Sequence, residues 1–180
     1  MNRADLQMSV AVLNAAGVCA LPTEGVWGLS SRIDHLHAVG RILQIKQRAP
    51  SKGLIVLVSD FAQLSDWYTC PILESAYLES GRPSTWVVPV NGDCPSILTG
   101  GRSSLAVRQV KMPFLRSIID RTGPIVSTSA NRSGRPACQF RWQVMLQLSD
   151  QVDYVSCART QGYVKPSTIC DMASGNVIRA

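Results

Sequence analysis

The apolar residues of the chain alternate between helical and strand-like spacing from one end to the other. Leu6 and Leu13 lie on one helical face, which predicts an amphipathic helix that Gly17 closes as a C-terminal glycine. Residues 18–21 and 54–58 are short apolar runs, and the second is typical of a strand buried on both faces of a sheet. Because helical and strand-like segments interleave, the pattern predicts an α/β fold.

The same pattern continues to the C-terminus without an interruption that would separate two domains. Asp34 is expected to cap a helix that ends near Lys46, and Pro113 to begin another helix at its first turn. No linker-like stretch and no internal repeat divides the 180 residues, so a single domain over residues 1–180 with a mixed sheet is expected. The other helices are expected at residues 61–67, 71–78 and 139–148, and the other strands at 85–90, 105–107, 124–126, 152–156, 167–171 and 176–179.

Composition and charge narrow the class of protein. With 46% apolar and 17% charged residues, the chain is an ordinary globular protein and not a disordered one. Its formal charge is +6, and 14 of its 18 basic residues are arginine. The planar guanidinium group suits carboxylate and phosphate, so this bias favours recognition of anions, nucleic acid included. A GC-rich genome would produce the same bias.

The cysteines and histidines indicate neither a disulfide framework nor a metal site. No C-x-x-C pair is present, and His35 and His37 have no cysteine or acidic cluster nearby in the sequence, so no metal-ligating residues are predicted. The uncharged stretch from residue 7 to residue 23 is too short and too polar to span a bilayer. We therefore expect a cytoplasmic protein without membrane contact, in which buried, reduced cysteines occupy positions 19, 70, 94, 138, 157 and 170.

A cluster of hydroxyl groups follows the apolar run at residues 124–126. Four hydroxyls and the amide of Asn131 lie between Ser127 and Ser133, which exceeds what a turn requires. The surplus favours a cradle for an acceptor-rich group such as phosphate, carboxylate or ribose. The alternative is a polar loop that caps a helix.

Arg108 ends the strand predicted at residues 105–107. Burying its charge would be costly unless an anion were paired with it, and ligands of open α/β sheets gather at such strand ends. The alternative is an exposed strand end beside Asp120 or Asp171. The chain lacks G-x-S-x-G, H-E-x-x-H, Walker and G-x-G-x-x-G motifs. Chemistry that depends on cationic clamps and positioning, as in phosphoryl or nucleotidyl transfer, fits this set best.

Six blocks in register resemble the YrdC/TsaC family, the threonylcarbamoyl-AMP synthases. The resemblance covers nearly the whole chain and implies a YrdC-like single domain: a twisted mixed sheet with flanking helices and a concave basic cleft. The blocks are Pro22-Thr23-Glu24 with Gly28; Lys46-Gln47-Arg48 with Lys52-Gly53-Leu54-Ile55; Pro83-Ser84-Thr85; Leu105-Ala106-Val107-Arg108; Ser127 to Gly134; and Pro166-Ser167-Thr168-Ile169.

The resemblance also implies an activity. Such an enzyme forms threonylcarbamoyl-AMP and pyrophosphate from L-threonine, bicarbonate or CO2, and ATP with magnesium, and the product serves tRNA modification. Arg48, Lys52 and Arg108 would be catalytic together with Lys46. L-threonine would be bound by Thr23, Arg108, Ser127 and Ser167, and ATP by Arg48, Lys52, Ser104, Ser129 and Arg179.

Other implied features concern partners and departures. Threonylcarbamoyl-transfer proteins are expected partners, and tRNA or double-stranded RNA a further one. Glu24 is expected to have a structural or magnesium-related role, since a carboxylate repels anionic substrates, and Asn131 to shape its loop. Leu57 stands where some relatives have a histidine that contacts threonine. Arg82 lies in a loop that has the sequence Trp-Pro-Gly-Pro in many relatives.

Two other classes of protein remain open at this point. A non-catalytic RNA-binding or ribosome-assembly module would use the same basic surface, but it would not need the whole small-molecule set and would expose aromatic residues for stacking. Only 6% of the chain is aromatic, and Trp67, Trp86 and Trp142 are expected on core or helix faces. A carbamoyl-transfer domain of metallocentre maturation would carry further parts that this chain lacks.

Overall fold

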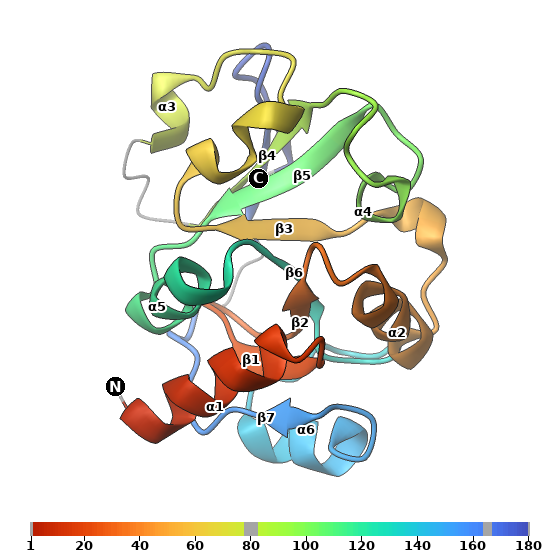
Figure 1. Cartoon of the computed structure of the whole chain (residues 1–180), viewed down its shortest axis with the longest axis vertical. Helices are drawn as coiled ribbons and strands as arrows, with labels where there is room; N and C mark the ends of the chain where they lie inside the picture. Colours follow the sequence, from red (N-terminus) through yellow and green to blue (C-terminus); the bar gives the residue numbers. More distant parts are fainter. Residues whose placement is uncertain (1, 78–82, 164–166, 180) are drawn as a thin grey trace.

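The computed structural model describes residues 2–77, 83–163 and 167–179. Within them, nine strands form one sheet in the order β7-β1-β2-β6-β3-β5-β4-β8-β9. The sheet follows the long axis of the molecule, with β7 at one end and the C-terminal strands β8 and β9, beyond β4, at the other (Figure 1). The strands are β1 (Cys19–Pro22), β2 (Trp27–Arg32), β3 (Ile55–Val58), β4 (Ser84–Pro89), β5 (Ser104–Gln109), β6 (Ile125–Ser129), β7 (Tyr154–Val155), β8 (Thr168–Asp171) and β9 (Val177–Arg179).

Helices connect and flank these strands, as the interleaved pattern predicts. The pairs β3–β5, β1–β7 and β4–β8 are parallel and the other pairs antiparallel, so the expected mixed α/β sheet is confirmed. The helices are α1 (Arg3–Asn14), α2 (Leu36–Lys46), α3 (Glu74–Tyr77), α4 (Ser96–Thr99), α5 (Pro113–Thr122) and α6 (Arg141–Leu148), with 3-10 turns η1 (Pro50–Lys52) and η2 (Phe61–Trp67).

The two faces of the sheet are covered differently. Paired residues on neighbouring strands point to the same face. Val56, Val107 and Val126 form one such row, and they belong to a buried cluster that includes side chains of α2. Leu57 and Ile125 point to the opposite face, into a second cluster with side chains of α1 and α5. At these positions the central strands are therefore covered by a buried cluster on each face, and Leu57 is a core residue.

Several local predictions were wrong because tertiary contacts decide the helix and strand ends. Ala16, not Gly17, takes the positive φ (58°) after α1, and the Gly17 N–H donates to the Val12 carbonyl. Asp34 does not cap α2, because its carboxylate pairs with Arg32 at 2.5 Å. The strand before the hydroxyl cluster extends into the cluster as far as Ser129, the end of β6.

Three further predictions were wrong about helix type, helix length or exposure. The helix expected at residues 61–67 is the 3-10 segment η2, and the one expected at 71–78 is only the four-residue α3 among the described residues. Cys157, expected to be buried, is exposed. Trp142 lies on a helix, α6, as expected, with 63% of its surface exposed. No helix in the described part of the chain is long and apolar enough to cross a membrane.

Asp5 fixes α1 to the far end of the sheet. Its buried carboxylate accepts hydrogen bonds from the Tyr154 hydroxyl (2.7 Å), the Ser156 hydroxyl (2.8 Å) and the Cys157 N–H (3.0 Å). A buried carboxylate is tolerated only when its lone pairs are satisfied in this way. The N-terminal helix and the chain after α6 are thus held together through one side chain.

We predict that Asp5→Ala lowers the free energy of unfolding by about 3 kcal/mol, because it leaves three donors, those of Tyr154, Ser156 and Cys157, without their acceptor. Urea denaturation followed by circular dichroism measures this loss. Asp120→Ala on exposed α5 surface is the matched control, and it is expected to change the value by less than about 0.5 kcal/mol. Equal stabilities for the two variants would contradict the role assigned to Asp5.

Candidate active site

The register of the sheet gathers the predicted site residues on one face. Ser127 of β6 pairs with Ser30 of β2 on one side and with Ile55 of β3 on the other. Ile55 in turn pairs with Ala106, two positions before Arg108 on β5. Since paired and alternate positions share a face, the hydroxyl of Ser127 and the guanidinium of Arg108 belong to the same side of the sheet.

Arg108 is the centre of a polar cluster made from four segments. Its Nε donates to the Thr85 hydroxyl on β4 (3.1 Å), and its Nη2 donates to the Ser167 hydroxyl (2.8 Å). The two hydroxyl oxygens lie 3.0 Å apart. Nη1 lies 3.7 Å from Oε2 of Glu24, and the Arg108 side chain is 14% exposed. The alternative of an exposed strand end beside Asp120 or Asp171 is therefore wrong.

The electrostatics of Arg108 follow from this burial. Loss of water lowers the pKa of its guanidinium, the neighbouring Glu24 raises it, and Arg179 lowers it again. Arginine stays protonated through such shifts, because its ordinary pKa lies far above neutral pH. Arg108 is consequently a permanent cation whose fork already contacts two hydroxyl groups that a stronger acceptor could replace.

Thr23 and Ser127 lie side by side because residue 28 is a glycine. The Thr23 hydroxyl donates to the Val26 carbonyl at 2.7 Å, which closes the turn between β1 and β2. A Cβ at Gly28 would stand 2.7 Å from Oγ of Ser127 and 3.4 Å from Cγ2 of Thr23. A side chain at this position would therefore separate two residues that the sequence assigned to threonine binding.

Lys46 lies beneath the end of the hydroxyl cluster. It is buried, and its Nζ donates to the carbonyls of Ser129 and Asn131 and to Oδ1 of Asn131. Burial, helped by the nearby Arg48, lowers the pKa of Lys46 to about 8. Its donors are directed to the loop, so the structure places Lys46 as a brace of residues 129–131.

Asn131 completes this brace, in agreement with its expected role in shaping the loop. Its Oδ1 also accepts from the Ser129 hydroxyl (2.6 Å), and its Nδ2 donates to the carbonyls of Arg132 (3.0 Å) and Arg135. The backbone N–H of Ser133 donates to the Lys46 carbonyl at 2.9 Å. The cluster is thus half strand and half braced loop.

A second group of cations surrounds the turn η1. Arg48 donates from Nη2 to the Gly53 carbonyl at 3.0 Å, and its buried Nε has no partner among the described residues. Burial and the charge of Arg102 both lower the pKa of Arg48, so these two guanidinium groups are neighbours. Lys52 is exposed in η1. Arg48, with its unpaired donor, is thus close to Arg102 and to the backbone of Lys52.

The remaining predicted residues divide between the two groups. Ser167 is buried against Thr85 and Arg108, and Arg179 on β9 is exposed and donates from Nη2 to the Ser167 carbonyl at 3.3 Å. Ser104 is half-buried at the start of β5. The links between the groups are β6, which carries Ser127 and Ser129, and Arg48, whose charge acts on Lys46.

Sequence reasoning missed two members of these groups. Thr85 was quoted in the Pro83-Ser84-Thr85 block but assigned no role, although it holds Nε of Arg108. Arg102 was not singled out, although it lies beside Arg48; its position between Gly101 and the strand residue Ser104 was the available signal. The departure at Leu57 is now explained as core packing, and the departure at Arg82 lies outside the described residues.

The described part of the chain contains no cluster of three or more histidine, cysteine, aspartate or glutamate side chains that could hold a metal ion. The acidic group of the Arg108 cluster, Glu24, is paired with a cation. Magnesium commonly keeps several waters and is held through one or two carboxylates together with substrate phosphates. These residues therefore do not form a resident magnesium site, and we derive no step from one.

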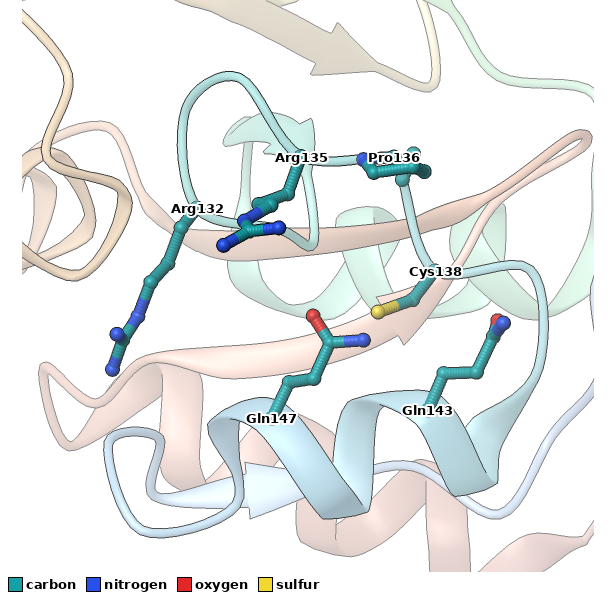
Figure 2. A pocket seen from close by; sticks show the side chains of 7 residues that line it. Arg132, Arg135, Pro136, Cys138, Gln143 and Gln147 are labelled. Carbon is teal, nitrogen blue, oxygen red and sulfur yellow. The ribbon is translucent and has the colours of Figure 1, made fainter.

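A separate hollow of about 580 Å³ lies between the loop after β6 and helix α6. Figure 2 shows Gln143 and Gln147 extending from α6 toward Cys138 and Arg135, with Arg132 at the side. None of the predicted site residues lines this hollow. It is therefore distinct from the Arg108 and Arg48 groups.

Comparison with known proteins agrees with this geometry. The sequence profile of the Sua5/YciO/YrdC family, described as "Telomere recombination", matches residues 11–180. The threonylcarbamoyl-AMP synthase of Chromohalobacter salexigens is 39% identical over 175 residues, which cover 95% of this chain and 94% of the relative. The threonylcarbamoyl-AMP synthase of Vibrio cholerae is 39% identical over 181 residues, which cover 97% of this chain and 96% of the relative.

Solved structures show the same fold. Sua5 of P. abyssi complexed with L-threonine superposes with a TM-score of 0.83 at 26% identity, and the match covers 96% of this chain and 52% of that one. This chain therefore spans about half the length of that relative. The MTH1692 protein of Methanobacterium thermoautotrophicum has a TM-score of 0.75 at 27% identity, with 97% of this chain and 85% of that one covered. The chain belongs to the Sua5/YciO/YrdC family, which confirms the resemblance to YrdC-type proteins.

We predict that Lys46→Ala destabilises the protein by about 3 kcal/mol, because it removes a donor shared by three oxygens and leaves the buried carbonyl of Asn131 without a hydrogen-bond partner among the described residues. Thermal unfolding measured by calorimetry tests this, with Lys111→Ala as the matched exposed control. A Lys46→Ala variant as stable as that control would show that the amine does not brace the loop.

Proposed function

We propose that this protein is a threonylcarbamoyl-AMP synthase that uses L-threonine, bicarbonate or CO2, and ATP, and releases pyrophosphate. The observation that carries the proposal is the buried guanidinium of Arg108, whose fork is held by two hydroxyl groups on the sheet face that also carries Ser127. Support comes from relatives that are named threonylcarbamoyl-AMP synthase and from a Sua5 structure complexed with L-threonine.

In this proposal Arg108 binds the carboxylate of L-threonine. Its present partners, the hydroxyls of Thr85 and Ser167, are neutral acceptors. Exchange for a carboxylate gives charge-assisted, bidentate bonds, which are roughly twice as strong as neutral ones. Thr23, Ser127 and Ser167 would contribute hydroxyl groups to the rest of the amino acid.

ATP would lie on the cations of the second group, across a concave basic cleft. Arg48 has a buried Nε without a partner among the described residues, and Lys52 is exposed beside it. A triphosphate offers the acceptors that these donors lack, and it would bring its own magnesium. Arg102 joins this set as an addition to the residues that the sequence nominated. The other ATP contacts would come from Ser104, Ser129 and Arg179.

The proposed reaction needs two anions to approach one another. The ammonium group of threonine first loses a proton to solvent, and the free amine adds to CO2, which forms an N–C bond and releases a second proton. An oxygen of the resulting carbamate attacks the α-phosphorus of ATP. A new P–O bond forms, the bridging P–O bond to the β-phosphate breaks, and pyrophosphate leaves with its electron pair. Fixed guanidinium groups offset this charge without having to reorganise, which is how preorganised sites lower such barriers.

The product would then serve tRNA modification in the cytoplasm, through partner proteins that transfer the threonylcarbamoyl group. Binding of tRNA or double-stranded RNA is a further expectation for the same basic surface. The synthesis itself uses small molecules alone and does not require those partners.

Pyrophosphate release by the purified protein tests the proposal. We expect release from ATP only when magnesium, L-threonine and bicarbonate are all present, with loss of the signal when any one is omitted. Release that does not depend on L-threonine would contradict the proposal, and so would no release from a protein that remains folded.

We predict that Arg108→Ala lowers kcat/KM for L-threonine by about 100-fold or more, since a bidentate charged contact is lost. The KM for ATP should change far less. Arg108→Lys keeps the positive charge but not the bidentate guanidinium geometry. Its kcat/KM for L-threonine is therefore expected to lie between those of the wild type and of Arg108→Ala. Unchanged threonine kinetics in a folded Arg108→Ala variant would refute the assignment.

We predict the opposite selectivity for Lys52→Ala. Removing this exposed cation is expected to raise the KM for ATP roughly tenfold, about 1.4 kcal/mol, and to leave the KM for threonine nearly unchanged. Steady-state kinetics with Lys111→Ala as control measures both values. An equal KM for ATP in the two variants would contradict the assignment of Lys52 to the nucleotide site.

A further inference from the structure

Glu24 presents a buried carboxylate oxygen that lacks a hydrogen-bond donor. The residue is 4% exposed, and among the described residues its Oε2 accepts no hydrogen bond. The nearest cation, Nη1 of Arg108, stands 3.7 Å away, which is an ion pair but longer than a hydrogen bond. Leaving such an oxygen unsatisfied costs free energy, so the position is suited to receiving a donor from outside the protein.

The backbone holds this carboxylate in place. The Glu24 carbonyl accepts from the Tyr163 N–H at 3.1 Å, and the Thr23 N–H and hydroxyl both donate to the Val26 carbonyl. A Cβ at Gly25 would stand 2.8 Å from the Tyr163 carbonyl. The turn from β1 to β2 is therefore clamped on both sides of Glu24, and the side chain has little freedom to leave Arg108.

The charges around this point decide which ligand fits. Glu24 and Arg108 cancel one another, so a simple carboxylate bound to Arg108 would leave one net negative charge in a dry site. An amino-acid zwitterion brings one charge of each sign and leaves none. The other cation that acts on Arg108 is Arg179, which is exposed to water and therefore more strongly screened.

We propose that Glu24 binds the ammonium group of the amino-acid substrate and makes the site selective for amino acids over other carboxylates. This rests on the proposed threonine site at Arg108. The ammonium and carboxylate of an α-amino acid are attached to the same carbon atom, so their partners must lie side by side, as Glu24 and Arg108 do. One ammonium proton supplies the donor that Oε2 lacks, in a charge-assisted hydrogen bond.

This assignment gives Glu24 more than the structural or magnesium-related role that its sequence position suggested. If the carboxylate only neutralised Arg108, it would affect every ligand of the guanidinium in the same direction. If it binds ammonium, it attracts ligands that carry an amine and repels those that lack one. The two roles therefore predict opposite effects of Glu24 on the affinity for a carboxylate ligand that has no amine.

The experiment compares L-threonine with 3-hydroxybutyrate, which is threonine with hydrogen in place of the amine. Binding of each to the whole protein is measured by ligand-observed NMR titration for the wild type, Glu24→Gln and the exposed control Glu74→Gln. We expect the wild type and the control to prefer L-threonine. In Glu24→Gln, L-threonine should bind at least roughly tenfold more weakly, the loss of a charged hydrogen bond, whereas 3-hydroxybutyrate should bind equally or more tightly.

The possible failures are distinguishable. Equal weakening of both ligands in Glu24→Gln, or a preserved preference for L-threonine, would overturn the role of Glu24 and leave the Arg108 site intact. A wild-type protein that does not bind L-threonine would overturn the proposed function together with this inference. Should Glu24→Gln fail to fold, Glu24→Asp retains the charge and is expected to keep the preference for L-threonine, and loss of that preference would contradict the proposal.

Discussion

The guanidinium of Arg108 is held below the surface of the sheet by groups that come from three other segments of the chain. Thr85, Ser167 and Glu24 surround it, and none of them is adjacent to it in sequence. A permanent charge can remain in so dry a place only with such partners. The order of the strands, the parallel pairing of β4 with β8 and the turn after β1 are all needed to bring these partners together.

The two cationic groups divide the work that the proposed reaction requires. The Arg108 group is dry, nearly neutral and surrounded by hydroxyls, which suits a small zwitterion. The group around Arg48 contains several positive charges and an unpaired donor, which suits a polyphosphate. Strand β6 connects them, because Ser127 adjoins Thr23 while Ser129 joins the brace formed by Lys46. The family relationship is consistent with this division.

Much of the architecture could be predicted from the sequence, whereas the contacts inside the site could not. The apolar run of β3 and the Pro113 start of α5 are local signals, and both are confirmed. Strand β6 was cut short in the prediction because hydroxyl residues favour turns, but pairing with β2 and β3 outweighs that preference. The contact between Arg108 and Glu24 depends on the sheet order, which no local pattern specifies.

The most direct test is a crystal structure of the protein with L-threonine and a non-hydrolysable ATP analogue. The account predicts the threonine carboxylate on the Arg108 guanidinium, in exchange for its bonds to Thr85 and Ser167, with the triphosphate on Arg48 and Lys52. Threonine bound away from Arg108, or a triphosphate bound in the hollow beside α6, would contradict it.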